Sequence, residues 1–295
     1  MKINTNVSSL TAQEAATNTN KAITSSLEKL STGLKINKAA DDASGLAIAD
    51  KLRTQVTSIN QGIANGNSAV ALLQIADKSM AEQSKILDTV KAKLIQANTD
   101  TTSVAGRTAI AKDVTKLLDQ LNNIAKQTNY NGTTLLQKSA ASSDEQTGLS
   151  FQIGESTADL ISTQKIQANV SGFALDTLKG DVSAGAVVAS DATAATTGIF
   201  TRGMASDGQA AVDLAITKLN GYRGDIGSTQ NQVESAVRNL MTQATNIKNA
   251  ESVLRDVDYA EESANFNKLN IISQAGSYAI SQSNAVSQNV LRLLQ

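Results

Sequence analysis

The chain has 295 residues and a formal net charge of −1, a balance that gives no support to nucleic-acid binding. It contains no His and no Cys, which excludes disulfides, thiolate nucleophiles and the side chain best suited to proton transfer at neutral pH. It also contains no Pro, although average usage would give roughly fifteen, so no proline interrupts a long helix. We therefore expect a mainly helical chain with no catalytic residues, no metal site and no cofactor.

The first predicted elements are helical stripes near the N-terminus, where only three of the first 27 residues are charged. The segment lacks the apolar run of a secretory signal, so we expect a chain without a cleaved leader, and no stretch is apolar enough for membrane insertion. Its apolar residues step by four and three, as in one face of a helix. We expect these residues to be buried by partner helices: Ile3, Val7, Leu10, Ile23, Leu27 and Leu30.

A polar break, TGLKINKAADDASG, follows the first helical segment. Gly33 can close the preceding helix, and Asp42 or Ser44 can cap the next one, so we interpret the Asp41-Asp42 pair as turn and cap rather than as an acid–base or metal site. From about 44 to 98 the chain follows a heptad seam, because nine of thirteen positions stepping by four and three are large and apolar. The seam begins with Leu52, Val56, Ile59, Ile63, Val70 and Leu73.

A shorter seam from Ile110 to Ile124 predicts a third helix, which NYNGTTLL ends. From about Gly148 the apolar residues alternate in places with Ser, Thr and Gln, which predicts one or two β-hairpins. The segment 176–205 is rich in Gly, Ala, Ser and Thr with little periodicity, so we expect a short, surface-exposed variable loop.

A second long seam runs through the predicted helix at 207–254, where ten of thirteen positions are apolar, among them Val233, Val237, Leu240 and Ile247. We expect this helix to run antiparallel to the one at 44–98, since neither can bury its stripe alone. The glycines of NGYRGDIG do not follow a strand, and we interpret them as close packing or local flexibility rather than nucleotide binding.

The last helical stripe reaches the C-terminus and is nearly free of charge. The 27 residues from Leu269 to Gln295 hold one charged side chain, Arg292. Asn, Gln, Ser and Thr can be buried with hydrogen bonds and without the desolvation cost of an ion. This composition predicts burial against the N-terminal helix and against copies of the chain, through Ile272, Ala279, Val286, Val290, Leu293 and Leu294.

Several motifs resemble bacterial flagellin, in the order in which that family has them. They are SLEKLSTGLKINKAADDASGLAIADKLR, QTNYNGTTLL, FQIG, IGSTQNQ, NAESVLRDVDYAEE and QAGSYAISQSNAVSQNVLRLL. The resemblance covers about residues 1–175 and 205–295. It implies a long antiparallel coiled-coil bundle with a small β-hairpin region and paired terminal helices.

The resemblance also implies a domain organisation and a function. Segments 1–40 and 256–295 would form the paired terminal helices of a filament's inner tube, 41–175 and 206–255 the bundle of its outer tube, and 176–205 a surface loop whose Ser and Thr residues are candidate glycan sites. The function would be that of a structural subunit, not an enzyme, that self-polymerises into the extracellular flagellar filament for motility. Its expected partners are further copies of the chain, a flagellar export chaperone on about 256–295, and the filament cap and hook-associated proteins, after unfolded export through the flagellar type III apparatus.

One departure from the family concerns the stretch 88–96, DTVKAKLIQ. The resemblance places an innate-immune receptor site there, around Asp88, Thr89, Ala92 and Gln96. Immunostimulatory members carry Arg at the position of Thr89 and Glu at that of Ala92, so we expect weak receptor activation. Two alternative functions share parts of the pattern: a hook–filament junction protein, and a cytoplasmic coiled-coil signalling protein.

Overall fold

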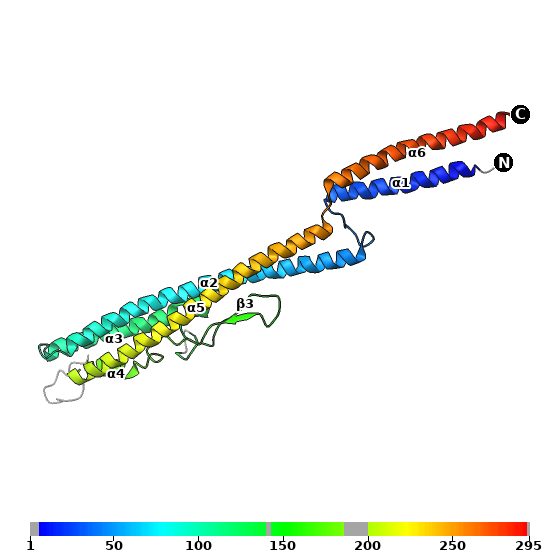
Figure 1. The fold of residues 1–295 in the computed structure, drawn as a ribbon. Helices are drawn as coiled ribbons and strands as arrows, with labels where there is room; N and C mark the ends of the chain where they lie inside the picture. Colours follow the sequence, from blue (N-terminus) through cyan, green and yellow to red (C-terminus); the bar gives the residue numbers. More distant parts are fainter. Residues whose placement is uncertain (1–5, 140–142, 186–199, 294–295) are drawn as a thin grey trace. The chain divides into compact units, whose positions relative to one another are not determined.

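The computed structural model describes residues 6–139, 143–185 and 200–293, and within them six helices and two short hairpins. Figure 1 shows the elements in chain order. They are α1 (Val7–Thr32), α2 (Ala43–Ala97), α3 (Val104–Gln127), β1 (Asn129–Tyr130), β2 (Thr133–Thr134), β3 (Ser150–Gln152), β4 (Leu160–Ser162), α4 (Asp176–Gly185), α5 (Arg202–Arg255) and α6 (Tyr259–Leu293). The mainly α prediction is confirmed.

The helix ends follow local capping chemistry. Asn6 caps α1 by accepting a hydrogen bond from the backbone N–H of Ser9, and Gly33 ends the helix with a left-handed φ of 74°. Asp42 caps α2, since its Oδ1 accepts from the backbone N–H groups of Ser44 and Gly45 at 3.0 and 2.9 Å. The predictions for Gly33 and Asp42 are confirmed, and Ser44 lies inside the helix.

The two longest helices, α2 with 55 residues and α5 with 54, match the two predicted seams. Both are divided between two compact units. The terminal unit combines the chain up to Thr57 with the chain from Gln243 onward, and the bundle unit is Ser58–Thr242. The sequence-based boundaries near 40 and 256 lie instead at the ends of these helices.

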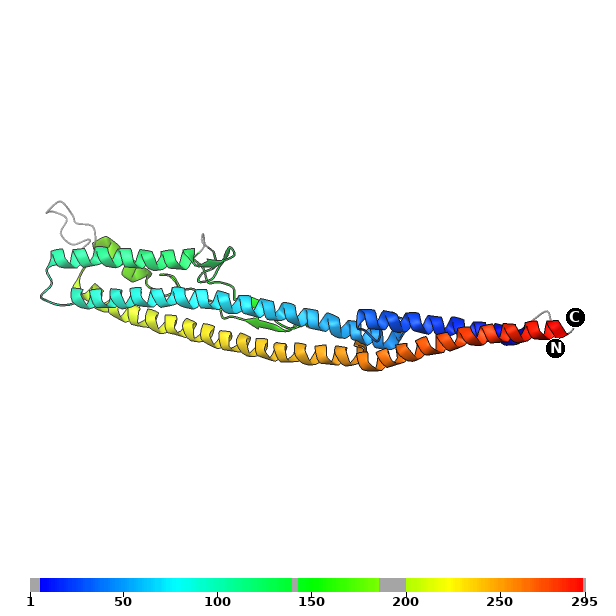
Figure 2. The ribbon, with the colours of Figure 1, turned by 90° about the horizontal axis from the view of Figure 1, so that it is seen from above.

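The bundle unit is built around one large hydrophobic core. Parts of α2, α3 and α5 lie side by side, as both views show (Figures 1 and 2). Buried residues recur every three or four positions along most of these helix segments, as the heptad spacing requires. The fully buried side chains include Leu73, Met80, Leu87 and Leu94 of α2, Leu118 and Leu121 of α3, and Val212 and Leu219 of α5.

A smaller second core holds the β3–β4 hairpin. Ala69, Ile153, Val233 and Val237 are buried together there. The strands pair antiparallel with Phe151 opposite Ile161, which confirms a hairpin in the predicted region.

The β1–β2 hairpin was not anticipated, because NYNGTTLL was interpreted only as the end of a helix. Asn131 and Gly132 adopt φ values of 49° and 82° between paired Tyr130 and Thr133. Positive φ at both central residues is the mark of a two-residue hairpin turn, for which Asn-Gly is the strongest sequence signal.

The predicted surface loop at 176–205 is wrong for most of its described residues. Residues 176–185 form α4, whose Leu178 and Val182 are buried with i, i+4 spacing, and Lys179 forms an ion pair with Asp119 of α3 at 2.7 Å. Phe200 and Ala205 are also fully buried. The buried side chains of Leu178, Val182 and Phe200 pack this segment against the core despite its loop-like composition. Residues 186–199 lie outside the described residues.

Candidate functional site: the terminal helices

Within the terminal unit, α1 and α6 run antiparallel and side by side, as we predicted for the two ends of the chain (Figures 1 and 2). Contacts between small and polar residues join them at several points. Asn6 Nδ2 donates to the carbonyl oxygen of Ser283 at 3.2 Å, and the Ser273 hydroxyl contacts Asn20 Oδ1 at 3.4 Å. Ala16 lies opposite Gly276, where a Cβ placed on the glycine would be 4.0 Å from that of Ala16.

The only buried α1 residue is Ser26, and its hydroxyl donates to the carboxylate of Glu262. No residue of α6 whose side chain the structure describes is buried. The large apolar residues of the pair are at most half-buried among the described side chains, as Leu30 of α1 and Phe266 of α6 are.

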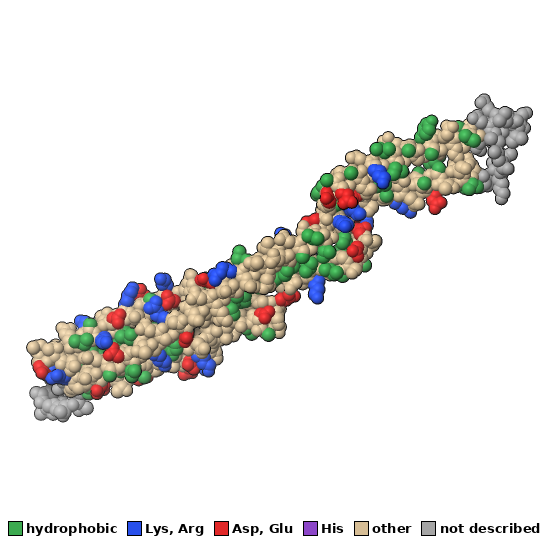
Figure 3. All heavy atoms as spheres, in the orientation of Figure 1, with side chains coloured by type: hydrophobic (Ala, Val, Ile, Leu, Met, Phe, Trp, Pro, Cys, Tyr) green, Lys and Arg blue, Asp and Glu red, His purple; other side chains and the backbone are tan. Residues whose placement is uncertain are grey.

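Large apolar side chains of the pair are instead exposed to solvent. Leu10 is 55% exposed, Leu27 is 54% exposed and Tyr278 is 72% exposed. Figure 3 shows apolar side chains on the surface of this pair. An apolar surface of this kind on an isolated chain marks an interaction site. The other exposed members are Val7, Tyr259, Ile271, Ile272 and Val286.

The predicted packing residues of the terminal helices divide into three groups. Ile23 and Leu30 are half-buried, whereas Val7, Leu10, Leu27, Ile272, Ala279 and Val286 are exposed. Val290 and Leu293 lie in α6, but the structure does not describe their side chains. Ile3 and Leu294 lie outside the described residues. The polar residues that join α1 to α6 were not singled out. Their signal was the same lack of charge that marked the apolar stripe.

The predicted seam residues of α2 and α5 differ in burial. Ile59, Leu73, Val233 and Val237 are buried. The remaining seam residues are half-buried: Leu52, Val56, Ile63, Val70, Leu240 and Ile247. Some lie in the parts of α2 and α5 that belong to the terminal unit, where the structure provides fewer neighbours.

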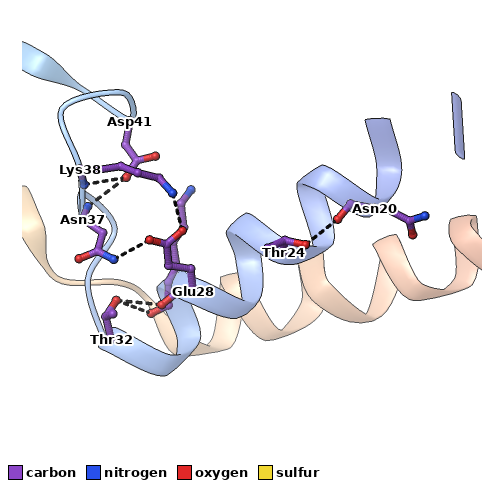
Figure 4. A network of polar contacts seen from close by, with 8 residues as sticks. Asn20, Thr24, Glu28, Thr32, Asn37, Lys38 and Asp41 are labelled. Carbon is purple, nitrogen blue, oxygen red and sulfur yellow. Dashed lines mark hydrogen bonds and ion pairs between the residues drawn. The ribbon is translucent and has the colours of Figure 1, made fainter. Parts of the chain in front are cut away.

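A polar network holds the connector between α1 and α2, residues 33–42, against the end of α1 (Figure 4). Glu28 accepts from Asn37 Nδ2 at 3.0 Å and from Lys38 Nζ at 2.6 Å. Asp41 Oδ2 accepts from the backbone N–H groups of Asn37 and Lys38, both at 3.1 Å.

These contacts shift three ionisation equilibria. The hydrogen bond from Lys38 lowers the pKa of Glu28 below its ordinary 4.5, and the same contact raises the pKa of Lys38 above 10.5. The backbone N–H of Lys38, followed by that of Asn37, lowers the pKa of Asp41 below 3.8. Asp41 thus organises a turn, which agrees with the structural role predicted for the Asp41-Asp42 pair.

The connector also pairs with the end of α5. Leu34 and Asp256 form an antiparallel bridge, with hydrogen bonds from Lys35 N–H to the Arg255 carbonyl and from Val257 N–H to the Gly33 carbonyl at 2.6 and 3.0 Å. The terminal unit therefore joins segments from opposite ends of the sequence by backbone pairing as well as by helix contact.

Two further features bear on function. The described part of the chain has no helix with the length and apolarity that crossing a membrane requires. Among the same residues, no three His, Cys, Asp or Glu side chains are grouped as a metal ion would need. The receptor-like stretch is on the surface of α2, where Asp88, Thr89, Ala92 and Gln96 are all exposed.

Comparison with known proteins identifies the family. The model of the bacterial flagellin N-terminal helical region matches residues 3–141, and that of the C-terminal helical region matches 209–294. Flagellin of Bacillus subtilis (strain 168) is 34% identical over 309 residues, and the flagellar filament 33 kDa core protein of Treponema phagedenis is 31% identical over 296, each with all of both chains covered. Among solved structures, the crystal structure of Bacillus cereus flagellin aligns with a TM-score of 0.47 and 23% identity, over 64% of this chain and 94% of that one. The matches to both helical regions and the full-length similarity to these relatives show that the chain belongs to the bacterial flagellin family.

Proposed function

We propose that the chain is the repeating structural subunit of an extracellular bacterial flagellar filament and has no catalytic role. The observation that carries this proposal is the α1–α6 pair, which buries no apolar side chain among the described ones and leaves large apolar residues exposed. Such a pair gains most of its burial from neighbouring copies. A head-to-tail contact that does not close into a ring produces an open helical filament.

The full-length relatives favour a filament subunit over the alternatives. A flagellin and a filament core protein are both similar over their entire lengths, which favours this function over a hook–filament junction protein. A signalling coiled coil would need one uninterrupted helical hairpin. Here α3, α4 and the β-hairpins pack along the long helices of the bundle.

The composition suits export in an unfolded state through the flagellar type III apparatus. A chain without Cys or Pro refolds without disulfide exchange or prolyl isomerisation, which are among the slowest folding steps. We propose that a flagellar export chaperone covers about 256–295 before assembly, because large apolar residues of α6 such as Ile271 and Tyr278 are exposed. The filament cap and hook-associated proteins would meet the same terminal surface, and Ser and Thr residues on the outer surface would carry any glycans.

The test is polymerisation of purified protein with and without the last dozen residues. Seeded or salted-out full-length chains should form long filaments in electron micrographs. The chain lacking residues 284–295 should remain monomeric, while its circular dichroism retains the melting transition of the bundle unit. Normal filaments from the truncated chain would contradict the role given to the terminal helices.

A further inference from the structure

The heptad seam between α2 and α5 contains a charged pair at a position where an apolar contact is expected. Asp77 lies between the seam residues Leu73 and Met80 of α2, and Arg223 lies between Leu219 and Ile226 of α5. These four neighbours are at most 2% exposed. Arg223 Nε donates to Asp77 Oδ1 at 2.8 Å, and the two side chains are 36% and 33% exposed.

An apolar seam by itself does not define how two long helices align. Because the apolar positions repeat every seven residues, sliding α5 by one heptad along α2 again places apolar residues opposite apolar residues. The helices would move by about 10 Å relative to each other, at 1.5 Å per residue. Long seams of this kind are therefore prone to alternative alignments.

The charged pair distinguishes these alignments. A slip of one heptad in one direction places Arg223 opposite Val70 and Asp77 opposite Ile216. A slip in the other direction places them opposite Ser84 and Gln230, which carry no charge. In both cases two partly buried ions lose their ionic partner and lie opposite apolar or uncharged residues, which is unfavourable.

We propose that Asp77 and Arg223 specify the register of α2 against α5 and so select one bundle alignment when the chain folds. Shape also favours this alignment, since Val237 lies where a Cβ on Gly66 would be, with its Cγ2 at 2.5 Å from that position. The pair adds a requirement for opposite charges at one point of the seam, which apolar packing does not provide. Single polar positions in the seams of coiled coils specify register in the same way. This inference concerns folding of the bundle unit and does not depend on the proposed filament role.

The register can be measured directly in the full-length monomer. The chain has no Cys, so Lys85→Cys on α2 and Ser228→Cys on α5 provide two exposed sites for spin labels. A one-heptad slip changes their separation along the helix axis by about 10 Å. Electron–electron double resonance should give a single distance for the otherwise unaltered chain.

Three variants distinguish charge from shape. With Asp77→Leu and Arg223→Leu together we expect a second distance population, whereas the swap of Asp77→Arg with Arg223→Asp should keep the single native distance. Lys93→Leu with Asp113→Leu removes an ion pair between α2 and α3 and should also keep the native distance. A single native distance in the double-leucine variant would overturn the proposal, because packing alone would then define the register.

A like-charge variant keeps the test decisive if the double-leucine chain does not fold. Arg223→Asp alone places two carboxylates together and should lose the single distance. Adding Asp77→Arg should then restore it. Failure of this restoration in a chain that remains helical by circular dichroism would also overturn the proposal.

Discussion

Two glycines of the long helices differ in what surrounds them. At Gly62 of α2 a Cβ would overlap the backbone carbonyl of Ile153 in the β3–β4 hairpin. Asn65, one turn further along α2, donates a hydrogen bond from Nδ2 to the Gln152 carbonyl at 3.0 Å. At Gly221 of α5 nothing lies within 4 Å of such an atom. The hairpin therefore approaches α2 at a point where only glycine fits.

Gly62→Ala and Gly221→Ala should consequently change stability in opposite directions. We expect Gly62→Ala to lower the free energy of unfolding by about 1–3 kcal/mol through overpacking against a backbone atom. Gly221→Ala should raise it by about 1 kcal/mol, because alanine is the better helix former and has open space there. Urea unfolding followed by circular dichroism gives both values. Equal stability of the two variants would show that the hairpin does not depend on close contact at Gly62.

Residues Thr89 and Ala92 support a prediction about recognition. Both are exposed on α2, so substitutions there leave the core unchanged. Since the chain lacks the charges that the family resemblance places at these positions, we expect weak activation of reporter cells that bear the innate-immune receptor. Thr89→Arg with Ala92→Glu should increase the response, and a full response to the unaltered chain would contradict the prediction.

At the scale of elements, the connector of residues 33–42 depends on carboxylates that must be ionised. Glu28 and Asp41 have pKa values lowered by folding, so their contribution to stability is present above their ordinary values of 4.5 and 3.8 and is lost as the pH falls through the lowered values. Lys38 has a raised pKa, so its contribution is present below 10.5 and is lost only at higher pH. The connector should thus be fully ordered across the neutral range and should loosen in strong acid.

This acid response can be followed by NMR. The backbone amide protons of Asn37 and Lys38 donate to Asp41, and their resonances should shift on acidification with a midpoint below 3.8. In Asp41→Asn the transition should disappear. Glu28→Gln serves as the comparison, because it removes the other carboxylate and leaves both amide contacts in place. A midpoint at or above the ordinary value would mean that these hydrogen bonds do not persist in solution.

The elements differ in how well the sequence predicts them, for identifiable reasons. Long periodic stretches and their caps at Gly33 and Asp42 were predictable, because each depends on residues close together in the chain. Helix α4 was not, since Leu178 and Val182 are its only large apolar residues and give too short a pattern to indicate a helix. The apolar stripes of α1 and α6 were visible, but periodicity defines a face of a helix and does not say what covers it. The contact of Asn6 with Ser283 joins residues 277 positions apart.

At the scale of the whole molecule, the two compact units should differ in local stability. The bundle unit has a large apolar core, whereas α1 and α6 bury almost none of their described side chains. In the monomer we expect backbone amides of α1 and α6 to exchange with deuterium at least about 100-fold faster than those of α3 around Leu118 and Leu121. Mass spectrometry of peptides resolves these segments, and polymerisation should slow exchange in α1 and α6. Equal protection of the backbone amides of α1, α3 and α6 in the monomer would contradict the expected difference in local stability.

The composition of the terminal unit from two distant segments has a consequence for truncated chains. All residues of the bundle unit lie before Gln243, whereas α1 has its partner only when α6 is present. A chain cut before Tyr259 would therefore keep every residue of the bundle unit and leave α1 unpaired. Such a chain could not present the paired helices to another copy, so a truncated subunit would be excluded from assembly.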